Sequence, residues 1–172
     1  MGEKYTVDGD IPPWTRLVDF LREKAKLCGT KVVCREAGCG ICTVVITRPD
    51  LEHEGRYKTY SVPSCQTLLY ACDGWSIESV ENLGDRFTGY HSLQKALHGF
   101  TGTQCGYCSP GMIMHMYGQI QNGPLTMSQV ERSLDGNLCR CTGYRPILDA
   151  FKSFAVDADQ VLKNKLTDIE RQ

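Results

Sequence analysis

The 172-residue sequence predicts an α+β fold, with a small sheet and one helix in residues 1–80 and a small helical bundle in residues 81–156. β-branched residues, which strands favour, are concentrated in the first half and form the run Thr43–Thr47 (TVVIT). Beyond residue 81 they become scarce, and apolar residues recur at helical spacing. The charged tail, residues 157–172, lacks a long apolar face and is expected to be a weak helix or disordered.

In the first half, the apolar pattern predicts one helix after Pro13. Leu17, Phe20 and Leu21 fall on one helical face, and Gly29 is expected to end the helix. Besides the TVVIT run, strands are expected at three segments: Lys4–Val7, Tyr57–Val62 and Ser76–Val80.

In the second half, two helix-start signals support the bundle. Ser109 is expected to be an N-cap with Pro110 at the first helical position. Thr126 and Gln129 match a capping box. The helices are expected at four places: Ser92–Phe100, Gly111–Gln121, Met127–Leu134 and from Pro146 onward.

Charge and composition exclude several classes of function. The 19 Lys and Arg residues balance 20 Asp and Glu residues, and no basic run is typical of nucleic-acid binding. No apolar stretch approaches the ~18 residues of a membrane span, and the N-terminus lacks the apolar core of a secretory signal. Without such a signal, the ten cysteines are more often metal ligands than disulfides, so we expect a cytoplasmic protein.

The first cysteine group has the spacing of a plant-type ferredoxin. Cys34, Cys39 and Cys42 follow the pattern C-x4-C-x2-C, in which three thiolates on one loop wrap a 2Fe–2S cluster. Gly38 and Gly40 flank Cys39, where the backbone must approach the cluster closely and positive φ is expected. The loop amides can then donate hydrogen bonds to the cluster sulfurs.

The fourth ligand of this group has two candidates. Cys72 is favoured, because the adjacent Asp73-Gly74 turn can present it on a loop. Cys65 is the alternative. Otherwise Cys65 and Cys28 are expected to be ordinary small buried residues.

The second cysteine group combines Cys105-x2-Cys108 with Cys139-x-Cys141. Cys108 directly precedes one predicted helix, and Cys139 and Cys141 precede the helix that begins at Pro146. Helix N-termini carry partial positive charge and free amides. Two of them pointing at one anionic cluster would stabilise its thiolates.

Zinc is the main alternative metal. Its common ribbon pattern separates two Cys pairs by about 15–20 residues, whereas the gaps here are longer and Cys-x-Cys is a poor zinc knuckle. The four histidines have no paired metal or catalytic spacing. Nothing in the sequence is typical of a substrate pocket.

Three motifs together closely resemble the N-terminal iron–sulfur region of the molybdenum hydroxylases, the xanthine dehydrogenase and aldehyde oxidase family. They are GTKVVCREAGCGICTV, GTQCGYCSPGMIMHMY and GNLCRCTGYRPILDAF, and the resemblance covers residues 3–156. The linker SVPSCQTLLYACDGW is more similar to aldehyde oxidases of insect type than to vertebrate xanthine dehydrogenases.

The resemblance implies a plant-ferredoxin-like β-grasp domain followed by a four-helix-bundle 2Fe–2S domain. The first cluster would be held by Cys34, Cys39, Cys42 and Cys72, and the second by Cys105, Cys108, Cys139 and Cys141. Electrons would pass from a molybdopterin centre, which Gln104 would touch, through both clusters to FAD. Molybdopterin and FAD would belong to further domains or partner subunits, and the full enzyme is expected to be a homodimer.

The sequence departs from the family pattern at three points. Ala37 stands where the family has glycine, so a positive φ there would strain the loop. The family's fourth ligand can lie two residues before Cys72, where this chain has Tyr70. The sequence begins at the turn after the family's first strand, so we expect the sheet to lack that strand, as in a truncated gene model or a splice form.

The sequence therefore predicts the electron-transfer module of a molybdenum hydroxylase, either part of a large oxidoreductase or a separate small subunit. By itself it is expected to hydroxylate neither aldehydes nor purines. The alternatives are a non-catalytic metal-binding interaction module and a non-functional truncated product.

Overall fold

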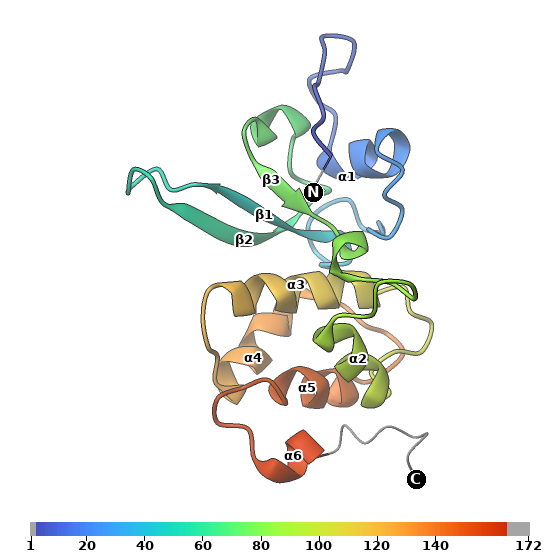
Figure 1. Ribbon diagram of the computed structural model, residues 1–172. Helices are drawn as coiled ribbons and strands as arrows, with labels where there is room; N and C mark the ends of the chain where they lie inside the picture. The colour runs from blue at the N-terminus through green and yellow to red at the C-terminus, as the bar shows by residue number, and fades with distance from the viewer. Residues whose placement is uncertain (1–2, 165–172) are drawn as a thin grey trace.

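The computed structural model describes residues 3–164 and shows a small sheet packed on a group of helices (Figure 1). The sheet is antiparallel, with the strand order β2-β1-β3. Its strands are β1 (Thr43–Pro49), β2 (Tyr57–Pro63) and β3 (Ser76–Glu78). The three predicted strands in these regions are confirmed.

The predicted strand Lys4–Val7 is wrong. This segment is not part of the sheet, and Tyr5 instead packs edge-on against Phe20, with 5.4 Å between the ring centres. A short alternating pattern forms a strand only where a sheet edge lies beside it, because the ladder supplies its hydrogen bonds.

The central strand β1 is buried on both faces. Val44 and Ile46 pack with Leu17 and Leu21 of the N-terminal helical segment, whereas Val45 belongs to the core of the helical half. Successive side chains of a strand point to opposite faces. The unbroken β-branched run is therefore explained by a strand whose two faces are both packed against apolar side chains.

The N-terminal helical segment is shorter than predicted. It begins as α1 (Leu17–Asp19) and continues as a π-helical turn, Phe20–Lys24. Lys26 adopts a left-handed conformation, with φ of 60°, which ends the helix before Gly29.

Four helices of the second half contact one another around one core, whose fully buried side chains include Leu93, Met112 and Phe151. They are α2 (Ser92–Gly99), α3 (Ser109–Gln121), α4 (Met127–Ser133) and α5 (Arg145–Lys152). All four predicted helices are present. The predicted Thr126–Gln129 capping box opens α4.

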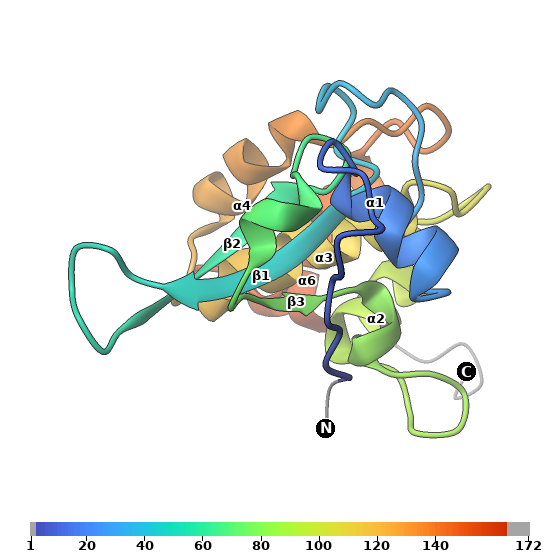
Figure 2. The same ribbon diagram turned by 90° about the horizontal axis from the view of Figure 1, so that it is seen from above.

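Helix α3 also covers the second face of the sheet, and lies between the strands and the other helices (Figures 1 and 2). Gly118 permits this contact, because a Cβ there would lie 2.1 Å from Ser61 Oγ. Ser61 Oγ donates to the His115 carbonyl at 3.1 Å, and Asn122 Nδ2 donates to the Thr59 carbonyl at 3.1 Å. The sheet and the bundle therefore share one helix.

The described part of the predicted tail contains a short helix, α6 (Gln160–Asn164). The rest of that prediction falls on residues 165–172, which lie outside the described residues. Within residues 3–164, none of the helices has the length and apolar character that a membrane crossing requires.

Candidate iron–sulfur sites

Cys34, Cys39 and Cys42 lie on the loop that leads into β1, and this loop directs backbone amides at sulfur. The amide of Glu36, followed by hydrogen bonds from Cys39 and Gly38, outweighs burial and lowers the pKa of Cys34 to about 7. A thiol with a lowered pKa is a ready metal ligand, because the thiolate is the ligating form.

Left-handed backbone shapes this loop at Arg35 (φ 58°), Ala37 (61°) and Gly40 (66°). The expected positive φ is therefore confirmed for Gly40 but wrong for Gly38. The positive φ lies on Ala37, one residue before Gly38. Ala37 therefore carries the backbone strain that its side chain was expected to cause.

Cys65 joins this loop from the segment that follows β2. Its amide donates to Cys42 Sγ at 3.4 Å, and the amide of Ala37 donates to the Cys65 sulfur. Burial, together with the neighbouring sulfurs of Cys42 and Cys34, raises the pKa of Cys65 to about 11. Cys65 and Cys42 are buried together against Val18.

Cys72, the favoured fourth ligand, lies elsewhere. It belongs to the apolar cluster around Leu17 and Leu69, and its thiol donates to the Leu68 carbonyl at 3.4 Å. Burial alone raises its pKa to about 11, with no contribution from another cysteine. The short helix Leu69–Cys72 explains the difference, because it turns Cys72 into the core instead of presenting it on the Asp73-Gly74 turn. The structure thus groups Cys65, not Cys72, with the other three.

Cys28, the remaining surplus cysteine, was expected to be buried, and this prediction is wrong. It is exposed on the turn after the N-terminal helical segment, where its thiol donates to the Arg22 carbonyl at 3.6 Å.

The structure brings the second group together from two loops. The thiols of Cys108 and Cys139 share a hydrogen bond, as do those of Cys105 and Cys141. Burial, followed by the bond with Cys139, raises the pKa of Cys108 to about 12. Electrostatic effects between Cys105 and Cys108 and between Cys139 and Cys141 link the two pairs.

This group is buried at one end and open at the other. Cys108 and Cys139 are buried, whereas Cys105 and Cys141 are exposed. Gln104, the predicted pterin contact, is also exposed and directly precedes Cys105.

Thr142 and Tyr144 support Cys139, and sequence reasoning gave neither of them a role. Burial opposes ionisation of Cys139, but the hydroxyl of Thr142, 3.1 Å from the sulfur, and the Thr142 amide outweigh it and lower the pKa. The hydroxyl of Tyr144 accepts from the Cys139 amide at 2.9 Å. Both residues lie between Cys141 and Pro146 of the next helix, and this closeness to the cysteines in the sequence could have indicated their role.

Helix α3 begins at Ser109, two residues before the predicted range Gly111–Gln121. Its N-cap is Cys108 and not Ser109, and the Met112 amide donates to the Cys108 carbonyl at 3.0 Å. The thiol of Cys108 therefore stands at the helix start itself, where the partial positive charge favours an anion.

Each group thus offers four thiols surrounded by backbone amides or a hydroxyl. Four thiolates with hydrogen bonds to sulfur are the donor set of a 2Fe–2S cluster. The residues present fit that cofactor at both places.

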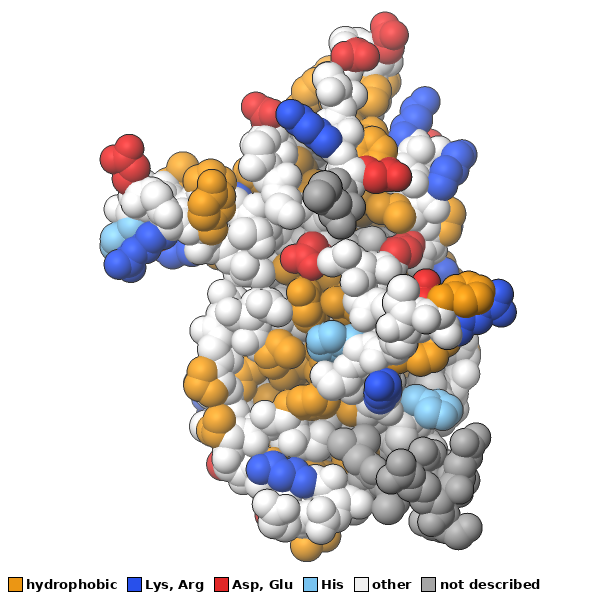
Figure 3. Space-filling model, viewed as in Figure 1, with side chains coloured by type: hydrophobic (Ala, Val, Ile, Leu, Met, Phe, Trp, Pro, Cys, Tyr) orange, Lys and Arg blue, Asp and Glu red, His pale blue; other side chains and the backbone are white. Residues whose placement is uncertain are grey.

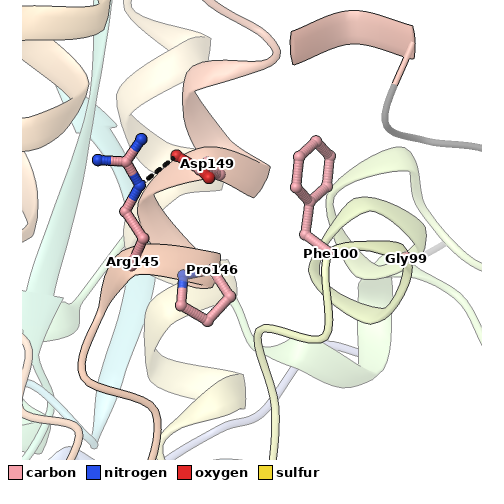
Figure 4. Close-up of a pocket in the computed structure, with 5 residues that line it drawn as sticks. All are labelled: Gly99, Phe100, Arg145, Pro146 and Asp149. Carbon is pink, nitrogen blue, oxygen red and sulfur yellow. Dashed lines mark ion pairs between the residues drawn. The ribbon is translucent and has the colours of Figure 1, made fainter. Parts of the chain in front are cut away.

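Two other features are distinct from these groups. An open hollow of about 320 Å³ lies between α2 and α5, where Arg145 Nε pairs with Asp149 at 3.0 Å (Figure 4). None of the cysteines lines this hollow.

The tip of the β1–β2 hairpin gathers acidic, basic and histidine side chains (Figure 3). Asp50 is already paired there with His53 Nδ1 at 3.0 Å and with Lys58 Nζ at 3.1 Å. These partners satisfy its carboxylate.

Comparison with known proteins places these groups in a family context. The family "2Fe-2S iron-sulfur cluster binding domain" matches residues 3–70, and "[2Fe-2S] binding domain" matches residues 79–152. Abscisic-aldehyde oxidase from Arabidopsis thaliana is 43% identical over 164 residues, which are 92% of this chain and 12% of that protein. Xanthine dehydrogenase from Calliphora vicina is 43% identical over 152 residues, 88% of this chain and 11% of that protein.

One solved structure is matched over nearly its whole length. This chain is 32% identical to a chain of quinoline 2-oxidoreductase from Pseudomonas putida 86, with a TM-score of 0.71. The match covers 91% of this chain and 86% of the quinoline 2-oxidoreductase chain. The chain belongs to the xanthine dehydrogenase and aldehyde oxidase family. The resemblance predicted from the cysteine motifs is thus confirmed.

The chain spans only 12% of the length of its Arabidopsis family relative. It carries the two 2Fe–2S binding domains of the family. Molybdopterin and FAD belong to the family's other domains. The match to the first domain contains Cys65 and ends before Cys72.

Proposed function

We propose that this chain is the electron-transfer module of a molybdenum hydroxylase. A 2Fe–2S cluster bound at each cysteine group supplies a centre that accepts and releases one electron. The observation that carries the proposal is the assembly of two separate four-thiol groups in adjoining loops of one small structure.

The proposed ligands differ from the sequence prediction at one position. Cys34, Cys39, Cys42 and Cys65 would hold the first cluster, and Cys105, Cys108, Cys139 and Cys141 the second. The contacts of Cys65 with Cys42 and Ala37 support its inclusion. Backbone amides at the first group and Thr142 at the second would stabilise the bound thiolates.

The same proposal includes the finer architecture. Residues 1–80 would form a ferredoxin-type β-grasp domain, residues 81–156 a four-helix-bundle domain, and 157–172 a tail. The three-stranded sheet with a helical segment on one face, and the four helices around one core, support this division.

The partners would be the molybdopterin and FAD parts of the same enzyme, as further domains or separate subunits. The second cluster would face molybdopterin, because Gln104, Cys105 and Cys141 are exposed at that end. The first cluster would pass electrons on to FAD. A homodimeric enzyme in the cytoplasm is the expected setting.

Metal analysis of the purified chain tests this function. We expect about four irons and four acid-labile sulfides per chain, two of each for every 2Fe–2S cluster. Reduction should produce two distinct EPR signals. Zinc in place of iron would instead identify a metal-stabilised interaction module, and a single cluster would contradict the two-centre proposal.

A further inference from the structure

The two cysteine groups are joined directly through the backbone. The amide of Leu138 donates to the carbonyl of Cys39 at 2.8 Å. Cys39 belongs to the first group, and Leu138 is bonded to Cys139 of the second. One hydrogen bond and one peptide link therefore separate a proposed ligand of each cluster.

A buried side chain makes the neighbouring bond. Asn137 is 4% exposed, and its Nδ2 donates to the Gly40 carbonyl at 3.0 Å. Asn137 is held in its own loop, since its amide donates to the Leu134 carbonyl at 3.0 Å. The side chain thus fastens the loop before Cys139 to the residue after Cys39.

The contact leaves no room for adjustment. A Cβ on Gly40 would lie 2.4 Å from the Gly136 carbonyl oxygen and 2.6 Å from Asn137 Nδ2. A Cβ on Gly111, in the first turn of α3, would lie 2.6 Å from the Gly40 carbonyl oxygen. Gly40 is therefore enclosed by the second cysteine group's loop on one side and by α3 on the other.

We infer that Asn137 is a positioning residue that sets the separation of the two iron–sulfur clusters. This inference rests on the proposed function. Its physical basis is that a hydrogen bond from a buried amide holds two loops in one register. Without the Asn137 donor, the Gly40 carbonyl keeps only its bonds from Thr43 within its own loop, so the side-chain bond between the loops is lost. Magnetic interaction and electron transfer between two centres both weaken steeply with distance.

Asn122, an exposed residue, provides a control at the other end of the interface. Its Nδ2 also donates across the interface between sheet and bundle, to the Thr59 carbonyl at 3.1 Å, but it does so from the C-terminal end of α3. The cysteine Cys108 lies at the opposite end of that helix. Asn122→Ala should therefore weaken the interface without moving the cysteine loops.

The test uses the full iron-loaded chain with Asn137→Ala, the nearly isosteric Asn137→Asp, and Asn122→Ala. When both clusters are reduced, their magnetic interaction splits the EPR lines. We expect the splitting to shrink in both Asn137 variants at unchanged iron content, and to persist in Asn122→Ala. Exchange of the Leu138 amide with solvent should be roughly tenfold faster in the Asn137 variants, as expected for loss of a buried hydrogen bond.

Wild-type splitting in both Asn137 variants would overturn the inference while leaving the proposed function intact. So would iron loss in Asn137→Ala combined with wild-type splitting in Asn137→Asp, because Asn137 would then only support the fold. A wild-type chain without two EPR signals would overturn the proposed function and this inference together.

Discussion

At the scale of single residues, backbone conformation decides how the first cysteine group is built. Ala37, in the loop between Cys34 and Cys39, has a φ of 61°, and its amide donates to Cys65. The conformation that directs this amide at sulfur is one that alanine disfavours and glycine tolerates. The backbone strain at Ala37 is therefore located beside the first cysteine group, which gains a hydrogen bond to the Cys65 sulfur from this conformation.

Replacing Ala37 with glycine should relieve this strain. We expect Ala37→Gly to raise the free energy of unfolding by about 1 kcal/mol, after allowance for the greater freedom of glycine in the unfolded chain. Urea unfolding checks the value. Gly38→Ala is the control: Gly38 lacks positive φ, and its Cβ would meet only the Glu36 side chain at 3.8 Å, so this variant should not lose stability.

The fourth ligand gives a second test at this scale. Cys65 and Cys72 are both buried, and the pKa of each is raised to about 11, yet only Cys65 contacts other cysteines of the group. Cys65→Ala should lose about half of the bound iron and one of the two EPR signals, because one of two equal clusters is lost. Cys72→Ala should keep both. The reverse result would restore Cys72 as the ligand.

At the scale of elements, α3 has two roles. Its first residue follows Cys108, while its middle packs on β1 and β2 through Gly118. A helix that lies so close to a sheet requires a residue without a side chain at the contact. The same element therefore supports the second cysteine group and closes the core beneath the sheet.

A methyl group at this contact should separate the two layers. In Gly118→Ala the new Cβ would lie 2.1 Å from Ser61 Oγ and 3.0 Å from a Val45 methyl group. We expect a loss of about 1–3 kcal/mol in the free energy of unfolding, typical of overpacking. Gly9→Ala, whose Cβ would meet no atom within 4 Å, should change it little. Equal stability of the two variants would contradict this close packing.

At the scale of the whole molecule, one histidine links the sheet, α3 and α4. His115 accepts from Ser61 through its carbonyl, and its ring donates to the carbonyl of Ser133. Its Nε2 is buried and has no hydrogen-bond partner among the described residues. Burial lowers the pKa of His115, despite the opposing effect of the Ser133 carbonyl.

This environment makes stability depend on pH. Because the folded-state pKa of His115 lies below the unfolded value of about 6.5, the unfolded chain binds the proton first as the pH falls. Stability is therefore complete above about pH 6.5 and declines below it, until the folded form is also protonated. Urea unfolding between about pH 7.5 and 5.5 should show a decline in wild type that His115→Gln lacks. Parallel curves for the two proteins would contradict this account.

Local signals predicted much of this molecule, because they act over a few residues. The β-branched run at 43–47, the Thr126 capping box and the spacing of seven of the eight proposed cysteine ligands were all readable along the chain. Distant contacts decide the rest: Lys4–Val7 has no sheet edge beside it, and Cys72 lies in the core, apart from the other cysteines of its predicted group.

The sequence by itself determined the family, the α+β composition and two sets of thiols, since spacing, propensity and capping are properties of short segments. Only the tertiary structure decided that Cys65 lies beside Cys42 of the first set, that α3 serves both layers, and that Asn137 joins the two cysteine loops. These are contacts between residues far apart in the chain. Their geometry depends on how the layers pack, which spacing along the sequence does not record.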